Sequence, residues 1–192
     1  VGGDYMNFIF ASDSFKGSLS SEKIGQILEN ELKKAIQEAS SKTFLIADGG
    51  EGTLDAFLCK EGAVRIEATV SDPLFRKIKS SYVVFGKTAV IALSEASGLP
   101  LLKKEEQNPL NTTTYGTGEL ILDALSRGYR DIVVAIGGSA TNDGGIGCMS
   151  ALGVKFLDDS GKIIHVVGKN LEKIAKIDTS LLVSCAKEAT FT

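Results

Sequence analysis

Three short segments combine glycine, hydroxyl or amide side chains and acids, a composition suited to holding anions. They are Asp-Ser-Phe-Lys-Gly-Ser at 13–18, Asp-Gly-Gly-Glu-Gly-Thr at 48–53 and Gly-Gly-Ser-Ala-Thr-Asn-Asp-Gly-Gly at 137–145. Glycine lets the backbone approach a ligand closely, and free N–H groups at a helix start favour phosphate. Each segment follows an apolar run, so we expect all three at the carboxyl ends of strands, converging on one ligand site.

The third segment has two interpretations that the residues leave open. In one, its N–H groups contact phosphate while Ser139, Thr141 and Asn142 add side-chain hydrogen bonds. In the other, the glycines supply positive φ and the polar side chains cap a helix. Asp143 fits an anion site if Mg²⁺ lies between it and the phosphates, and it equally fits a plain helix cap.

The first two segments carry the charged candidates. Lys16 can neutralise a phosphate as a point charge, or it can be an ordinary solvated lysine. Asp13 and Asp48 end two neighbouring strands, where paired acids can hold Mg²⁺ or accept a proton from a substrate hydroxyl. Helix capping is the alternative for both, with Glu51 as a favourable acid in the first helical turn.

Two other signals are rejected. Gly86-Lys87-Thr88 ends like a phosphate-binding P-loop, but Ser81 stands where that motif needs glycine, and a strand follows. We interpret it as a hairpin turn. His165, the only histidine, falls in a predicted strand without acid or cysteine at ligand spacing, so catalysis and metal binding are not expected of it. Triad hydrolase chemistry therefore has no support.

The composition excludes several classes of protein. The 192 residues carry 21 basic and 24 acidic side chains, a net charge of −3, so no nucleic-acid partner is expected. No apolar run has the length of a membrane span, and no secretory signal opens the sequence. Three scattered cysteines favour a reduced, cytoplasmic protein. Residues 1–5 precede the first strand pattern, and we expect them to be an added or upstream extension.

The chemistry-bearing turns need strands and helices to position them. Residues 8–11 read as a strand, 21–39 as a helix with an N-cap at Ser20 or Ser21, and 43–47 as a second strand. A helix then begins near Leu54. This β-α-β-turn-α order is typical of the start of a parallel sheet.

The middle of the chain changes character. Strands are predicted at 64–70, 77–85 and 88–93, a helix at 117–127 stopped by Gly128, and further strands at 131–136 and 154–157. The remainder is weakly patterned. We expect a boundary near Gly62, with residues 6–62 forming the first part of a discontinuous parallel-sheet domain and residues 63–192 a mixed second domain.

Four motifs together resemble the bacterial-type glycerate kinase family. They are "DSFKGSLS" from Asp13, "ADGGEGT" from Ala47, "NPLNTTTYGTGELILDAL" from Asn108 and "IGGSATNDGG" from Ile136. The resemblance extends over residues 6–178. It implies an α/β protein with an incomplete Rossmann-like parallel-sheet domain, an inserted mixed α/β domain and an active site in the cleft between them. It also implies transfer of the γ-phosphate of ATP, with Mg²⁺, to D-glycerate, giving 2-phosphoglycerate.

The resemblance assigns roles to residues of this sequence. Lys16, Asp48 and Asp143 become the catalytic candidates, with Asp48 and Asp143 also as Mg²⁺ ligands. The substrate- or phosphate-binding candidates are Asp13, Ser14, Gly49, Gly50, Glu51, Thr113, Thr114, Thr117, Gly138, Ser139, Thr141, Asn142, Gly144 and Gly145.

The sequence also departs from the family pattern. Members are nearly twice as long, and later glycine-rich motifs of the family are absent here. Ala92 stands where the family usually has glutamate, before Ser97-Gly98-Leu99. Two readings follow: a kinase that acts with a missing C-terminal half or as a homodimer, or a non-catalytic remnant that binds glycerate or nucleotide. In either case we expect exposed apolar surface on the incomplete sheet.

Overall fold

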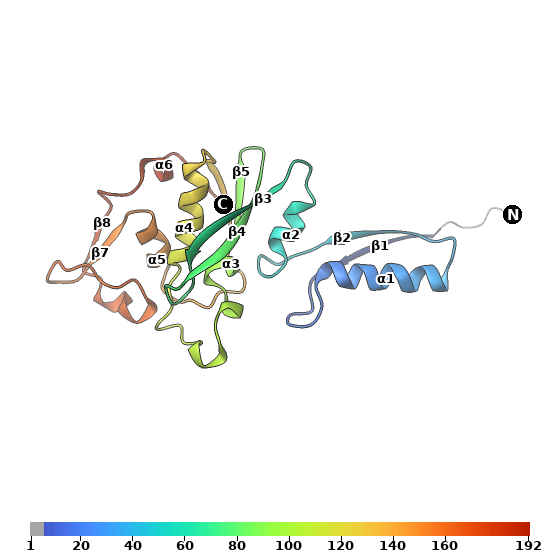
Figure 1. Ribbon diagram of the computed structural model, residues 1–192, viewed down its shortest axis with the longest axis horizontal. Helices are drawn as coiled ribbons and strands as arrows, with labels where there is room; N and C mark the ends of the chain where they lie inside the picture. Colours follow the sequence, from blue (N-terminus) through green and yellow to red (C-terminus); the bar gives the residue numbers. More distant parts are fainter. Residues whose placement is uncertain (1–5) are drawn as a thin grey trace.

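The computed structural model describes residues 6–192, which form a small arm and a larger body (Figure 1). The expectation for residues 1–5 lies outside the described residues. The arm, residues 6–47, consists of β1 (Asn7–Ser12), α1 (Ser21–Ala35) and β2 (Ser40–Leu45). β1 and β2 pair in parallel, so the predicted β-α-β unit is confirmed.

Local signals explain the helix of the arm. The Ser20 hydroxyl accepts a hydrogen bond from the Lys23 N–H at 3.2 Å, an N-cap interaction. The helix packs tightly on β2, because a Cβ at Gly25 would collide with the Thr43 side chain. It ends at Ala35, earlier than the apolar spacing predicted, since Ile36 already has extended backbone angles.

The body is built on a five-stranded mixed sheet of order β3-β4-β5-β6-β9. Its strands are β3 (Val64–Ser71), β4 (Lys77–Phe85), β5 (Thr88–Ala92), β6 (Asp131–Ala135) and β9 (Thr190–Phe191). β3, β4 and β5 are antiparallel, whereas β5, β6 and β9 run parallel. Phe85 pairs with Thr88 across Gly86-Lys87, which confirms the hairpin turn.

Helices cover both faces of this sheet. α4 (Tyr115–Ser126) packs its Leu120, Ile121 and Leu125 against one face, which includes Tyr82 and Ile91. On the other face, α2 (Thr53–Leu58) packs Leu54 against Val83, Val90 and Ala92. The alternation of neighbours such as Tyr82 and Val83 between the two faces is the period of two expected for strands.

A C-terminal lobe packs beside α4. It contains α5 (Ile146–Ala151), β7 (Lys155–Leu157), η3 (Gly168–Lys173), β8 (Lys176–Asp178) and α6 (Ser184–Lys187). Its core is formed by Ile146, Val154, Phe156, Ile164 and Val166. The connection between β5 and α4 holds α3 (Ser94–Ser97), η1 (Leu99–Leu101) and η2 (Lys104–Glu106).

The structure corrects two expectations. His165 lies in a loop, not in a strand, where its ring packs 4.8 Å from that of Phe75. The weakly patterned C-terminal stretch contains β8, α6 and β9, elements too short to leave a periodic signal. α2 packs on the body, and the boundary expected near Gly62 stays a prediction. Of the helices in residues 6–192, none combines the length and apolarity that a bilayer crossing requires.

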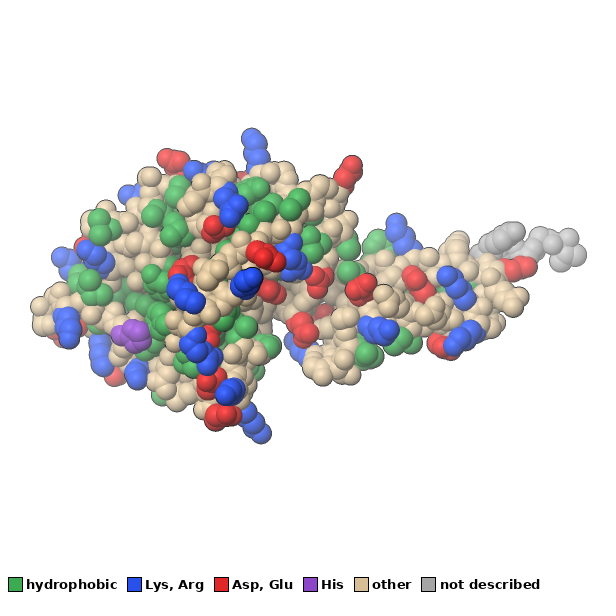
Figure 2. All heavy atoms as spheres, viewed as in Figure 1, with side chains coloured by type: hydrophobic (Ala, Val, Ile, Leu, Met, Phe, Trp, Pro, Cys, Tyr) green, Lys and Arg blue, Asp and Glu red, His purple; other side chains and the backbone are tan. Residues whose placement is uncertain are grey.

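One face of the two-stranded sheet in the arm is bare. α1 covers the side chains of Phe8 and Phe10, whereas Ile9, Phe44 and Ile46 on the opposite face are 71%, 42% and 43% exposed. Figure 2 shows hydrophobic side chains at the surface of the arm, interspersed with charged ones. Contiguous apolar surface of this kind marks a place where other polypeptide packs.

We therefore expect the chain to bind a hydrophobic dye through this face. Replacing Ile9 and Phe44 together by lysine should lower dye fluorescence by roughly a third or more, with helix content unchanged. Fluorescence titration and circular dichroism provide the measurement. Val64→Lys, at an exposed apolar position on β3, is the matched control. Equal dye binding by the wild type and the double variant would contradict this assignment.

Candidate active site

The carboxyl ends of four strands meet at one pocket. β1 and β2 lead into the turns at 13–18 and 48–53, and β5 and β6 lead into α3 and the glycine loop, defined here as residues 137–145. A cavity of about 290 Å³ lies among them, lined by Lys16, Gly17, Asp48, Gly50, Glu51, Ser94, Leu99, Pro100 and Gly138. Ligands of parallel sheets bind at this edge, so the pocket is the candidate site.

The first two turns are joined by an ion pair inside this pocket. Lys16 Nζ lies 2.9 Å from Asp48 Oδ2, with 76% and 47% of the two side chains exposed. The hydrogen bond from Lys16, reinforced by the Gly50 N–H on Asp48 Oδ1, lowers the pKa of the Asp48 carboxyl. The same hydrogen bond raises the pKa of the Lys16 ammonium. Both groups are therefore charged near neutral pH and open to a ligand.

The second turn and the glycine loop are joined through their backbones. The Gly137 N–H donates to the Gly49 carbonyl at 2.9 Å. A Cβ at Gly137 would lie only 2.6 Å from the Gly50 nitrogen, and Gly49 has a φ of +91°. Glycine at these positions allows the two turns to touch. Together with the Lys16–Asp48 pair, this contact brings together the three segments that the sequence analysis selected.

The fourth strand end was missed by the sequence analysis. β5 delivers Ser94, Leu99 and Pro100 to the pocket, and two backbone hydrogen bonds hold this segment along the glycine loop. The Leu99 N–H donates to the Gly138 carbonyl at 3.0 Å, and the Ala140 N–H donates to the Ser97 carbonyl at 2.9 Å. The segment has no glycine–acid turn after the strand, so no local signal marked it.

Asp143 lies beneath the glycine loop and is 1% exposed. Its Oδ2 accepts hydrogen bonds from the Thr114 N–H at 2.8 Å and the Thr114 hydroxyl at 2.9 Å, and from the Gly147 N–H at 3.2 Å. Its Oδ1 accepts from the Gly145 N–H at 3.0 Å. A buried carboxylate surrounded by donors is anchored by them, so this geometry favours an internal brace over contact with a ligand.

The predicted Mg²⁺ ligands therefore differ in how well they fit a metal ion. The carboxylate of Asp143 is buried and occupied by N–H and O–H donors, which does not suit a Mg²⁺ ligand. Asp48 fits better, because its carboxylate faces the pocket and Mg²⁺ is commonly held by one or two carboxylates plus phosphate oxygens. Within residues 6–192, no group of three or more acidic, histidine or cysteine side chains is arranged to hold a metal by itself.

The three threonine candidates are buried. Thr113 and Thr114 surround Asp143, and the Thr117 hydroxyl lies 2.8 Å from that of Ser97. Their hydroxyls are bonded to other protein groups, which suits a supporting role.

The remaining candidates lie nearer the surface. Asp13 Oδ1 accepts from the Ser14 N–H at 2.7 Å, and the Ser139 hydroxyl lies 2.8 Å from that of Thr141. Asn142 is exposed. Gly144 and Gly145 border an apolar hollow that is separate from the pocket lined by Gly138.

Ala92 occupies the end of β5, where its side chain is 1% exposed in the apolar cluster under α2.

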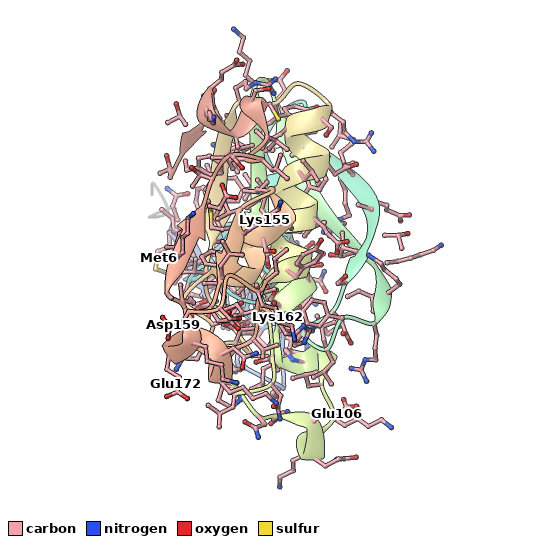
Figure 3. The ribbon with its side chains drawn as sticks, turned by 90° about the vertical axis from the view of Figure 1, so that its left-hand side faces the viewer. Met6, Glu106, Lys155, Asp159, Lys162 and Glu172 are labelled. Carbon is pink, nitrogen blue, oxygen red and sulfur yellow. The ribbon has the colours of Figure 1, made fainter. Side chains whose placement is uncertain are left out.

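A hollow larger than the pocket lies elsewhere on the molecule. It is lined by Asp158, Asp159, Ser160, Glu172 and Lys173. Figure 3 views the end of the molecule that carries it, with Asp159 and Glu172 labelled. Asp158 there accepts hydrogen bonds from Ser160 and Lys162 in its own turn, so we interpret this hollow as the surface of a turn.

Comparison with known proteins gives concordant matches. Residues 8–192 match the model of the glycerate kinase family. The glycerate kinase of Haemophilus influenzae is 44% identical over 92% of this chain and 47% of its own length. The glycerate 2-kinase of Escherichia coli is 42% identical over 91% of this chain and 46% of its own length. The chain thus spans about half the length of the curated relatives it matches.

A solved structure agrees with these relatives. A crystal structure from Salmonella typhimurium LT2, provisionally assigned as glycerate kinase 2, superposes with a TM-score of 0.79 at 36% identity. The match covers 98% of this chain and 51% of that chain. The mixed α/β fold of the two chains is therefore shared.

The bracing role of Asp143 predicts a large loss of stability. In Asp143→Ala, buried N–H groups of Thr114, Gly145 and Gly147 lose their acceptor, which should cost about 3–5 kcal/mol of unfolding free energy. Asp143→Asn should cost less, because one oxygen acceptor remains. Denaturant unfolding measures both. Asp159→Asn, at an exposed position, is the control and should change stability by less than about 0.5 kcal/mol. Unchanged stability in both Asp143 variants would disprove the brace.

The ion pair in the pocket predicts a shift in titration. Removing the ammonium in Lys16→Met should raise the pKa of the Asp48 carboxyl toward its ordinary value, since Lys16 is the largest cause of its depression. Carboxyl ¹³C chemical shifts followed against pH measure this change. Any stability from the pair is present above the unfolded pKa of Asp48 and is lost as pH falls through the lower folded pKa. Lys34→Met removes another exposed ammonium, paired with Glu31, and should leave Asp48 unaffected.

Proposed function

Because the chain belongs to the glycerate kinase family, we propose that it supplies the phosphoryl-transfer site of an enzyme that phosphorylates D-glycerate with ATP. The single observation that carries this proposal is the pocket at the four strand ends, where Lys16, Asp48 and the glycine loop come together. Phosphoryl transfer depends on positioning and on charge neutralisation. A lysine, a carboxylate and backbone N–H groups at one point supply both.

We assign glycerate to the pocket and the ATP phosphates to the adjoining part of the glycine loop. The volume of about 290 Å³ suits a small hydroxy acid better than a whole nucleotide. Gly144 in that stretch is exposed and has positive φ, and its N–H makes no hydrogen bond with residues 6–192. Such loops bind phosphate oxygens. The hydroxyl groups of Ser139 and Thr141 flank the same stretch.

Asp48 is the residue that would hold Mg²⁺, together with phosphate oxygens and water. When bound, the ion neutralises part of the triphosphate charge and holds the γ-phosphate near the acceptor hydroxyl. Asp13 and Glu51 are further acids in the same two turns. In this proposal Asp143 is a positioning residue for the loop, in place of the ligand role that its sequence position suggested.

The reaction itself needs few groups. A glycerate hydroxyl oxygen bonds to the γ-phosphorus while the bond from that phosphorus to the departing ADP oxygen breaks. Asp48 accepts the hydrogen bond of the attacking hydroxyl and then its proton. The low pKa of Asp48 makes it a weak base, which suffices because the transition state is loose and the proton leaves late. Lys16 exchanges its partner Asp48 for a phosphoryl oxygen.

The product that we propose is 2-phosphoglycerate. The name of the Escherichia coli relative, glycerate 2-kinase, supports this position of phosphorylation. The three cysteines, all unpaired thiols in the described residues, are consistent with the cytoplasmic location expected from the sequence.

The architecture that we propose has two domains. Residues 6–62 would be the first part of a discontinuous Rossmann-like domain, and residues 63–192 would be the inserted one, with the active site in the cleft between them. The bare face of β1 and β2 supports this arrangement, because parallel strands are usually covered on both faces. Polypeptide equivalent to the second half of the relatives would cover it, with a second copy of the chain as the alternative.

The alternative of a non-catalytic binding remnant is less well supported. Relatives at 42–44% identity are named glycerate kinases, and the pocket retains the lysine, the acid and the glycine contacts that the chemistry needs.

The test measures D-glycerate-dependent ADP release by the native protein that carries this sequence, with Mg²⁺ and with chelator. Asp48→Asn and Lys16→Ala should each lower kcat/KM about 10²-fold or more, with unchanged melting because both side chains are exposed. Asp159→Asn and Lys34→Ala are the matched controls. Near wild-type rates in both pocket variants would remove the site assignment. An absence of glycerate-dependent ADP release in the wild type would remove the kinase function.

A further inference from the structure

Ser94 is the one polar side chain of the pocket that neither the sequence motifs nor the mechanism above employs. It follows the end of β5 by two residues, and its side chain is half-buried at the pocket wall. Its hydroxyl makes no hydrogen bond with any of residues 6–192. The neighbouring Ser97 differs, since its hydroxyl is buried and bonded to Thr117. Ser94 therefore has a donor available for a molecule in the pocket.

Gly138 of the glycine loop lies beside Ser94. A Cβ built on Gly138 would lie 3.4 Å from the Ser94 Cβ, so Gly138 lies directly beside the Ser94 side chain. The Gly138 carbonyl is bonded to the Leu99 N–H, whereas the Gly138 N–H has no acceptor within the described part of the chain. The pocket therefore presents a hydroxyl and a backbone N–H, two neutral donors, on adjacent residues.

The charges around the pocket decide which ligand suits these donors. Asp48 and Glu51 oppose the single positive charge of Lys16, and Lys16 is already paired with Asp48. A triphosphate is poorly accommodated there without a cation, whereas a single carboxylate needs only a few donors. Leu99 and Pro100 supply an apolar wall against which a short carbon skeleton can lie.

We propose that Ser94, with the Gly138 N–H, binds the carboxylate of the acceptor substrate and so selects a small hydroxy acid over an uncharged polyol. This inference rests on the proposed function, since it places the acceptor, not ATP, in the pocket. Ser94 is a substrate-binding residue in this account. Its contact orients the acceptor so that the hydroxyl on the carbon next to the carboxylate, the C2 hydroxyl, faces Asp48.

The experiment measures equilibrium binding of D-glycerate and, separately, of a non-hydrolysable ATP analogue by calorimetry, with the native protein. Loss of a hydrogen bond to a charged group weakens binding by about tenfold or more. We expect that loss for D-glycerate in Ser94→Ala, with the affinity for the ATP analogue within about twofold of wild type. Ser150→Ala is the matched control, because Ser150 is also half-buried with a hydroxyl that lacks a described partner and lies on α5, outside the pocket.

Each other result overturns the inference in a distinguishable way. Unchanged D-glycerate affinity in Ser94→Ala rejects the carboxylate contact and leaves the kinase function intact. An equal loss of affinity for both ligands in Ser94→Ala assigns Ser94 a structural role. A loss of affinity for the ATP analogue alone assigns Ser94 to the nucleotide site. If the wild type does not bind D-glycerate at all, the proposed function and this inference fall together.

Discussion

The hydrogen bonds that surround the Asp143 carboxylate are the constraint on which the rest of the site depends. A buried carboxylate is costly unless donors replace its water, and here Thr114, Gly145 and Gly147 provide them. The Thr114 hydroxyl in turn accepts from the Cys148 N–H at 2.9 Å. The start of α4, the glycine loop and α5 are thereby fixed to one another. The position of Gly138 over Ser94 follows from this bracing and from the backbone bonds to Ser97 and Leu99.

The pocket also joins two parts of the molecule that differ in how densely they are packed. The glycine loop and the Ser94 segment belong to the body, whose central strands are covered on both faces. Lys16 comes from the arm, where α1, β1 and β2 pack mainly against one another. Elements with few buried contacts open at low free energy. The exposed Lys16–Asp48 pair thus joins the sparsely packed arm to the more densely packed body.

Much of the fold followed from local signals. The Ser20 cap, the apolar spacing of α1 and the Gly86-Lys87 hairpin were readable because each depends on residues close together in the chain. The glycine–acid turns were recognised for the same reason. Elements of two to four residues at the C-terminus, such as β8 and β9, were not predicted. The strands with which β8 and β9 pair lie far away in the sequence. Elements this short are also too small to show a hydrophobic period.

The sequence by itself determined most of the order of strands and helices, the three glycine–acid turns and the family. Tertiary structure alone decided which of the selected side chains face the pocket. Asp48 and Asp143 both follow strands in glycine-rich turns, yet Asp48 opens into the pocket while Asp143 is buried under donors from Thr114, a distant part of the chain. No sequence motif pointed to Ser94, which lies beside Gly138 because of its place after the end of β5. Burial and hydrogen-bond partners depend on which segments pack together, and composition and spacing along the chain do not encode that packing at single residues.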